Sequence, residues 1–152
     1  MAVVRGNLSS VAGYPDVMRR LQQLANPTLA KKYARKASRL AMTPMYKEAR
    51  LNMRMLDDPT TKEKIWRNMS LRNRKTTKDT VGTRLGVRGG AKEYKGGGLV
   101  GGDTFYWRFL EFGTKKIRAR SPMRRAFQHN VKGAEKEFAV EFRKQLMAGA
   151  IR

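Results

Sequence analysis

The first half of the chain carries apolar residues at three- and four-residue steps, a spacing that predicts amphipathic helices. A short helix is predicted over residues 16–24, stopped by Asn26 and Pro27. Thr28 is predicted to cap a long helix that follows, because its hydroxyl can accept a hydrogen bond from a first-turn N–H group. The inward side chains of this long helix are predicted to be Leu29, Tyr33, Ala37, Leu40 and Ala41.

Pro44 interrupts the long helix. Its ring crowds the carbonyl of Leu40 and it has no backbone donor, so we expect a kink or a break. Helical composition resumes after the proline and ends before Asp57. The next apolar segment, residues 65–71, is compatible both with a helical turn and with the start of a strand.

Two later segments alternate in the manner of strands. In residues 80–88 the positions fall into two sets, Val81, Thr83, Leu85 and Val87 on one face and Gly82, Arg84, Gly86 and Arg88 on the other. In residues 105–110 the corresponding sets are Phe105, Trp107 and Phe109, and Tyr106, Arg108 and Leu110. The pattern therefore predicts two antiparallel strands.

Seven of the chain's 14 glycines lie between the two predicted strands, in residues 89–102. Glycine loses the most backbone freedom when it becomes ordered, so this segment is predicted to be a long flexible loop. We expect the loop to become ordered only on contact with neighbouring subunits or other partners.

The last third of the chain reads as a turn, a basic loop and a helix. Gly113 is predicted to take a positive φ directly after the aromatic segment. Pro122 stands where a first-turn proline belongs, and the helix runs to about residue 147. Its inward side chains are predicted to be Phe127, Val131, Ala134, Phe138, Phe142 and Leu146.

These elements predict a single α+β domain over residues 1–152. A long N-terminal helix and a C-terminal helix are expected to pack on an antiparallel sheet with a long glycine-rich loop. Residues 1–13 are small and polar without a period, which predicts a mobile N-terminal arm.

The formal net charge is +22, with 34 Lys and Arg residues against 12 Asp and Glu residues. A surface this basic attracts nucleic acid, acidic protein or anionic membrane. The membrane has the least support, because no apolar run is long enough to span one and the first residues lack the apolar stretch of a signal peptide. The absence of cysteine excludes disulfides and thiolate metal sites and fits a reducing cytoplasm.

The sequence offers little that could perform catalysis. His129 is the only histidine, so no histidine pair or triad exists within one chain, and we expect it on the polar side of the last helix. Glu111 has no partner acid or base at readable spacing, and a pairing with a neighbouring arginine or an adjacent subunit is favoured over general-acid chemistry. The glycine run lacks the Gly-Lys-Ser/Thr ending of a phosphate-binding loop. We expect neither an enzyme nor a cofactor.

Basic residues form two clusters. The first falls within eleven residues without an acid among them and comprises Lys115, Lys116, Arg118, Arg120, Arg124 and Arg125. The second comprises Arg72, Arg74, Lys75 and Lys78. Such clusters are often only a solvated face, but the bias of the whole chain makes contact with a polyanion or an acidic partner equally plausible.

One segment, residues 106–127, resembles a known family. Its most specific part is Glu111, Phe112, Gly113 and Thr114 after an aromatic stretch, followed by an Ala-Arg step and by Pro122 at the start of a helix. This order is similar to that of the head–tail joining (tail completion) proteins of long-tailed bacteriophages. The resemblance implies a structural protein of the virion neck, assembled in the host cytoplasm as a ring of commonly six copies. Its expected partners are the tail tube protein, the head connector or stopper protein, and DNA passing through the lumen without sequence readout.

A second function stays open, that of a free nucleic-acid-binding protein of the ribosomal or nucleoid-associated kind. The charge fits such a protein, and Tyr106 or Trp107 could stack on bases. The chain has no RNA-binding aromatic motif, Gly-x-x-Gly clamp or zinc pattern. Solution mass and retention on heparin distinguish the two functions.

Overall fold

A computed structural model describes residues 22, 26–75, 77, 80–90 and 98–150. Its elements are α2 (Pro27–Ala41), α3 (Thr43–Leu56), α4 (Ile65–Asn68), β1 (Met69–Asn73), β2 (Thr83–Val87), α5 (Trp107–Phe112) and α6 (Pro122–Ala150). The predicted N-terminal arm and nearly all of the predicted helix 16–24 lie outside the described residues.

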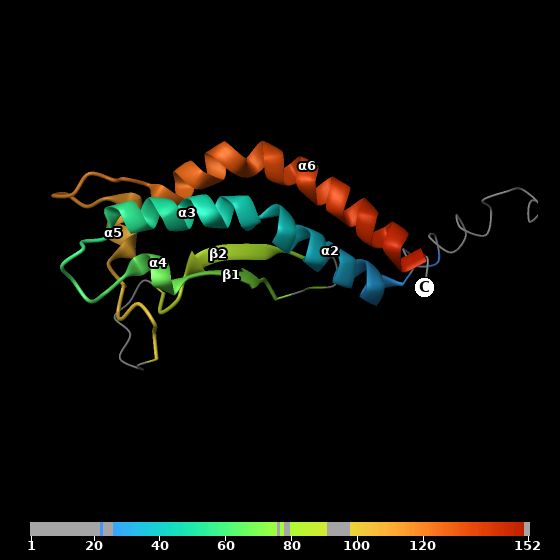
Figure 1. Ribbon diagram of the computed structural model, residues 1–152, viewed down its shortest axis with the longest axis horizontal. Helices are drawn as coiled ribbons and strands as arrows, with labels where there is room; N and C mark the ends of the chain where they lie inside the picture. The colour runs from blue at the N-terminus through green and yellow to red at the C-terminus, as the bar shows by residue number, and fades with distance from the viewer. Residues whose placement is uncertain (1–21, 23–25, 76, 78–79, 91–97, 151–152) are drawn as a thin grey trace, which may run out of the picture.

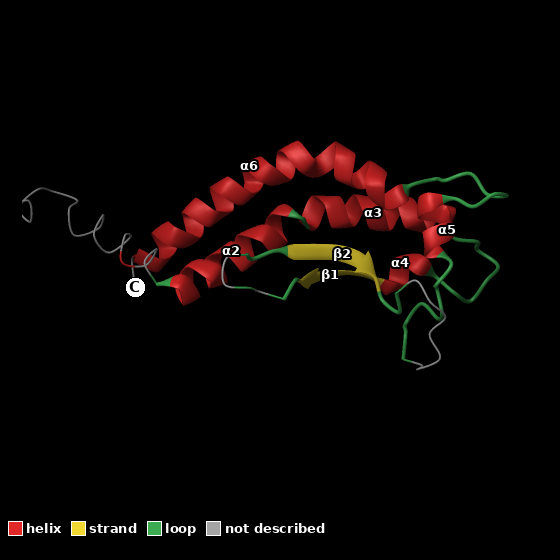
Figure 2. Ribbon diagram, turned by 180° about the vertical axis from the view of Figure 1, so that it is seen from behind, coloured by secondary structure: helices red, strands yellow, loops and turns green. Residues whose placement is uncertain are grey.

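The elements form three layers (Figures 1 and 2). The long helix α6 packs on α2 and α3, which run end to end, and the two-stranded sheet lies on the opposite side of α2 and α3. The α+β class is therefore confirmed. The C-terminal helix α6 was expected to pack on the sheet, but it packs on α2 and α3 instead. These two helices lie between α6 and the sheet.

Asn26 caps α2 at its N-terminus. Its Oδ1 accepts hydrogen bonds from the N–H groups of Thr28 and Leu29, at 3.0 and 3.3 Å. Pro27 occupies the first helical position, where a missing N–H group costs nothing. The prediction that Thr28 is the cap was therefore wrong by two residues, because the asparagine stands ahead of the proline and can reach the first free N–H groups.

The predicted interruption at Pro44 is confirmed. Helix α2 ends at Ala41, Met42 lies between the helices, and Pro44 sits in the first turn of α3. Ala37 and Ala41 are buried as expected, but Leu40 is 42% exposed and was wrongly placed inside. The buried stripe of α2 is narrow because it consists of alanines.

Residues 65–71 contain both of the structures that the sequence allowed, the single turn α4 and then β1. Strands β1 and β2 pair antiparallel, with Met69 opposite Val87 and Leu71 opposite Leu85. Met69, Leu85 and Val87 face the core, which is centred on Met45, Ala49, Met53, Ile65, Met69 and Ala126.

The predicted strand 105–110 is wrong, because this segment forms a turn and then helix α5. Tyr106, Trp107 and Leu110 contact the core and Glu111 is buried, a spacing of three and four residues that suits a helix. The glycine-rich segment consequently joins β2 to α5 and not to a second strand. Every residue of 105–110 is half-buried, so a strict alternation of inside and outside positions is absent.

The C-terminal end of the glycine-rich segment is held by hydrogen bonds within the subunit, which was not expected. Asn68, itself buried, accepts from the Gly101 N–H at 2.9 Å and donates to the Gly102 carbonyl at 2.7 Å and to Thr104 Oγ1 at 2.9 Å. The Lys64 N–H donates to the Gly101 carbonyl at 2.7 Å. Order at residues 101–104 therefore comes from within the subunit, whereas residues 91–97 lie outside the described part.

Helix α6 begins at Pro122 and includes Gly133, as predicted. Pro122 and Ala126 are its buried residues, while Phe127 is 52% exposed and was wrongly placed inside. Further along, the predicted inward side chains are half-buried, namely Val131, Ala134, Phe138, Phe142 and Leu146. The rings of Phe138 and Phe142 stack with centroids 5.7 Å apart.

Candidate interaction surface at the tip between α5 and α6

The turn after α5 depends on Gly113. Its φ of 77° and ψ of 177° lie in a region that is essentially restricted to glycine. A Cβ atom at this position would lie 2.9 Å from Ala119 N and 2.9 Å from the Ile117 carbonyl oxygen. The prediction of a positive φ is confirmed, although the turn follows a helix and not a strand. Gly113 thereby lets the chain double back closely on itself.

Glu111 joins α5 to the start of α6. Its side chain is 4% exposed, and its carboxylate oxygens accept hydrogen bonds from the N–H groups of Met123 and Arg124 at 2.9 and 3.0 Å. These N–H groups belong to the first turn of α6, where a negative charge is favoured. Of the two predicted partners, the neighbouring arginine side chain is wrong, because the carboxylate instead caps a helix that lies later in the chain. Pairing with an adjacent subunit stays a prediction.

Residues 114–121, here named the tip loop, project beyond the helices at the end where α3 finishes (Figure 1). The Thr114 N–H donates to the Ile117 carbonyl at 2.8 Å, and Thr114 Oγ1 accepts from the Lys116 and Ile117 N–H groups. At the base of the loop, the Arg120 and Ser121 N–H groups both donate to the Leu110 carbonyl. The loop is thus a hydrogen-bonded turn on a fixed base.

The four cations of the tip loop are all exposed, namely Lys115, Lys116, Arg118 and Arg120. The other two predicted contact residues lie on the first turn of α6 and are exposed as well. Of these, Arg124 lies over the Phe112 ring, with its guanidinium carbon 5.8 Å from the ring centroid. Arg125 and Arg120 line one groove of about 240 Å³ with Pro122. The structure therefore gathers the whole first cluster at one end of the molecule.

The groove also contains a polar contact between α3 and α6. Glu48 Oε1 lies 2.7 Å from His129 Nδ1, and Glu48 Oε2 accepts a hydrogen bond from the Asn130 side chain. The hydrogen bond from His129, followed by that from Asn130, lowers the pKa of Glu48 below its ordinary value of 4.5. His129 is on the polar side of α6, as expected, with its side chain 67% exposed.

Exposed apolar side chains accompany the cations. Phe112 is 64% exposed, Ile117 in the tip loop is 46% exposed, and Met55 near the end of α3 is 77% exposed. Met55 lines the same groove as Arg120 and Arg125. An apolar centre bordered by charged residues is the composition of protein–protein interfaces.

The second cluster lies elsewhere. Arg72, Arg74 and Lys75 are exposed along and just beyond β1, and Lys78 lies outside the described residues. The two clusters are therefore separate surfaces.

Within the described part of the chain, no group of three or more His, Cys, Asp or Glu side chains is placed to hold a metal ion. None of the helices described is both long and apolar enough to cross a bilayer. No protein-family model, curated protein or solved structure matches this chain.

Proposed function

We propose that the chain is a head–tail joining (tail completion) subunit of a long-tailed bacteriophage, located in the neck of the virion. Copies of the chain form a ring, with six as the expected number, that connects the tail tube to the head connector. The observation that carries the proposal is the tip, where Phe112 and Ile117 are exposed among the cations of the loop. Exposed apolar side chains among cations support a structural role in which the protein acts by binding to neighbouring proteins.

The construction of the tip supports the same role. The Glu111 cap, the Gly113 turn and the two hydrogen bonds to the Leu110 carbonyl fix the loop's base on α5 and α6. A loop that is held in shape loses less conformational freedom when it binds. Its cations complement an acidic surface of a neighbouring ring, and charges arranged in this way guide partners into register.

The proposal is tested by reversing Lys115, Lys116, Arg118 and Arg120 to glutamate. Exposed charges contribute little to folding, so the variant should remain folded with a normal thermal midpoint. It should nevertheless fail to join heads to tails, because acidic side chains would then face an acidic partner. The assay is in-vitro complementation of tails that lack this protein, scored as infectious particles.

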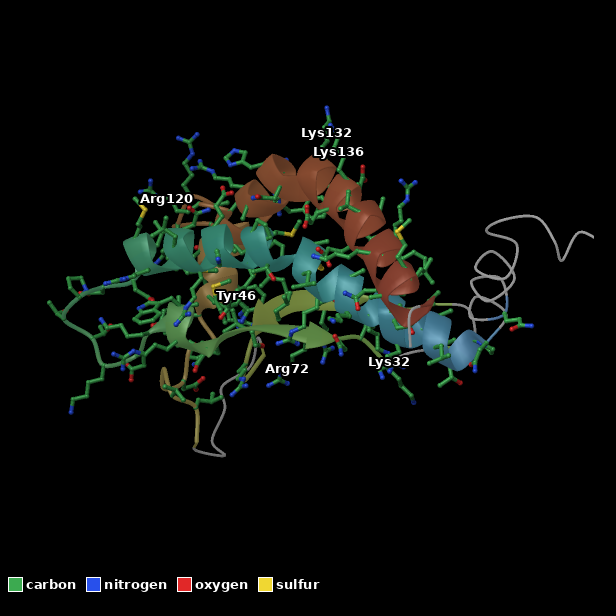
Figure 3. All side chains as sticks on the ribbon, turned by 45° about the vertical axis from the view of Figure 1, so that its right-hand side comes forward. Lys32, Tyr46, Arg72, Arg120, Lys132 and Lys136 are labelled. Atoms are coloured by element: carbon green, nitrogen blue, oxygen red, sulfur yellow. The ribbon has the colours of Figure 1, made fainter. Side chains whose placement is uncertain are left out.

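A control carries the same change of charge away from the tip. Exposed lysines of α2 and α6 serve this purpose, and the control variant reverses Lys32, Lys36, Lys132 and Lys136. Figure 3 labels Lys32, Lys132 and Lys136. It should keep most of the joining activity. Equal activity of the tip variant and the wild type, or equal loss in both variants, would contradict the proposal.

Solution mass separates this function from that of a free nucleic-acid-binding protein. Six copies of the 17.4 kDa chain give about 104 kDa, a value that light scattering distinguishes from a monomer. A monomer that stays on heparin to high salt and never assembles with tail tubes favours the second function.

A further inference from the structure

The register of β1 and β2 places a row of arginines on the side of the sheet that faces away from the helices. Arg72 lies directly opposite Arg84, and Ser70 lies opposite Gly86. The Arg88 N–H donates to the Asn68 carbonyl at 2.8 Å, so the ladder continues one pair beyond the strands at that end. The alternate residues Leu85 and Val87 contact the core, and Figure 3 shows Arg72 pointing away from α2 and α3.

A trough of about 410 Å³ runs along this face. Its lining comprises Ser70, Arg72, Arg84, Gly86 and Arg88 of this face, together with Leu85, Val87, Gly89, Gly90 and Trp107. We call it the arginine trough. Gly86 has no side chain to fill the trough, and a Cβ atom built there would meet nothing within 4 Å. The Trp107 indole N–H donates to the Gly90 carbonyl at 2.6 Å, which fixes the ring at the border.

The positive charge of the trough has no acidic side chain paired with it among the residues that the structure describes. Like charges directly opposite on a sheet destabilise it, and Arg72 and Arg84 are such a pair. None of the described acids forms an ion pair with Arg72, Arg84 or Arg88. The only acid in residues 69–88 is Asp79, which lies outside the described part. An anion bound in the trough would remove this repulsion.

We propose that the arginine trough binds the phosphate backbone of nucleic acid without reading its sequence. The ladder begins where the Arg74 N–H donates to the Gly82 carbonyl and ends where the Arg88 N–H donates to the Asn68 carbonyl. These two pairs are six residues apart along each strand, which is about 20 Å at roughly 3.3 Å per residue. A linear row of guanidinium groups matches the linear row of phosphates on a strand, and each guanidinium can bind a phosphate with two N–H groups.

Nucleic acid fits the trough better than an acidic protein does. The centre of a protein interface is depleted of charge and contains apolar or aromatic anchors. On this face of the sheet the positions between Arg72 and Arg88 carry only arginine, serine and glycine. Leu85 and Val87 also line the trough but pack against the core, and Trp107 stands at its border. The inference does not rest on the proposed ring, because each subunit carries a whole trough.

The test compares two variants that each lose three positive charges. Arg72, Arg84 and Arg88 are changed to glutamine in one, and Lys115, Lys116 and Arg118 in the other. Binding to a fluorescent 20-base-pair duplex is measured by anisotropy from 50 to 200 mM salt, with two unrelated duplex sequences. Each lost phosphate contact lowers the slope of log K against log salt by about 0.9, so the trough variant should lose about 2 to 3 units of slope on both duplexes.

The tip variant should lose less than about one unit, since its cations lie on a different surface. Equal losses in both variants would show that only total charge matters and would overturn the inference. Normal DNA binding by the trough variant, with lost binding to polyglutamate, would assign the trough to an acidic protein instead.

The thermal midpoint without DNA gives an independent readout. If the arginines serve a partner, the trough variant should be as stable as the wild type or more stable, because a like-charge pair has been removed. A fall of several degrees would show that the arginines support the fold and would also overturn the inference.

Discussion

Replacing Gly113 with alanine should destabilise the protein by strain at a single backbone position. At φ 77° and ψ 177° the glycine occupies a region that side-chain-bearing residues avoid at a cost of roughly 1–3 kcal/mol. The added Cβ would also press against main-chain atoms of residues 117 and 119, each 2.9 Å away. Main chain cannot rotate aside as a flexible side chain can, so we expect the upper part of this range.

For a chain of this size, 1 kcal/mol corresponds to a shift of about 2–4 °C in the thermal midpoint. The midpoint should therefore fall by about 4–12 °C, measured by circular dichroism. Urea denaturation should give a lower midpoint concentration with an unchanged slope, because the folded state remains equally compact.

Gly133 supplies a control of opposite sign. It lies within α6, and a Cβ atom there would meet nothing within 4 Å. Alanine at this position should stabilise the protein by about 0.5–1 kcal/mol, because alanine favours the helix more strongly. A Gly113→Ala variant as stable as the wild type would refute the assignment of strain, whatever Gly133→Ala does.

Three further substitutions test the contacts that hold the elements together. Glu111→Ala leaves two first-turn N–H groups of α6 without their buried acceptor and should cost about 1–3 kcal/mol in urea denaturation. Asn68→Ala, for the same reason, should cost a similar amount and should speed hydrogen exchange at Gly101. Glu48→Gln should make the free energy of unfolding depend less on pH in the acid range. Because the pKa of Glu48 is lowered in the folded state, its carboxylate contributes fully to stability above about pH 4.5, and this contribution is lost as the pH falls through the folded-state pKa. The difference in free energy of unfolding between wild type and variant should therefore close below about pH 4.5. A gap that persists unchanged at pH 3 would refute the role of the carboxylate.

Local signals in the sequence determined much of the fold. Pro44 cannot lie in the interior of a helix that continues from α2, because its ring would crowd the carbonyl of Leu40. Pro44 and Pro122 instead lie in the first turns of α3 and α6, where the fixed φ of proline is favourable. Gly113 was predictable since only a glycine readily adopts its backbone angles. Each of these positions acts through its own covalent structure, so no knowledge of distant residues is needed.

The aromatic segment 105–110 required knowledge of distant residues. Its side chains satisfy both a two-residue and a four-residue period, because nearly every position is apolar. The helix forms where Trp107 and Leu110 reach the core and Glu111 reaches the start of α6. Gly113 directly after the segment is a typical helix C-terminal residue and was the one local signal in favour of a helix.

The candidate surfaces were predicted in part. The first basic cluster was visible in the sequence, and the structure shows that all six of its side chains are exposed. The role of Glu111 could not be read, since its partners are backbone N–H groups that exist only after α6 has docked. The arginine trough was present in the alternation of Gly82, Arg84, Gly86 and Arg88, but its meaning depends on the register that sets Arg72 against Arg84.

The acids of the described chain explain why so much positive charge faces outward. Glu111 binds N–H groups of α6, Glu48 binds the side chains of His129 and Asn130, and Asp58 accepts from the Thr60 N–H and hydroxyl. These three carboxylates accept hydrogen bonds within the fold and do not form ion pairs with the described arginine side chains. Several arginines lie instead over aromatic rings, among them Arg50, Arg54 and Arg67, which surround Trp66. Stacking on a ring leaves the positive charge in place. The charge of the tip and of the trough is therefore available to partners, and salt should weaken binding at both surfaces.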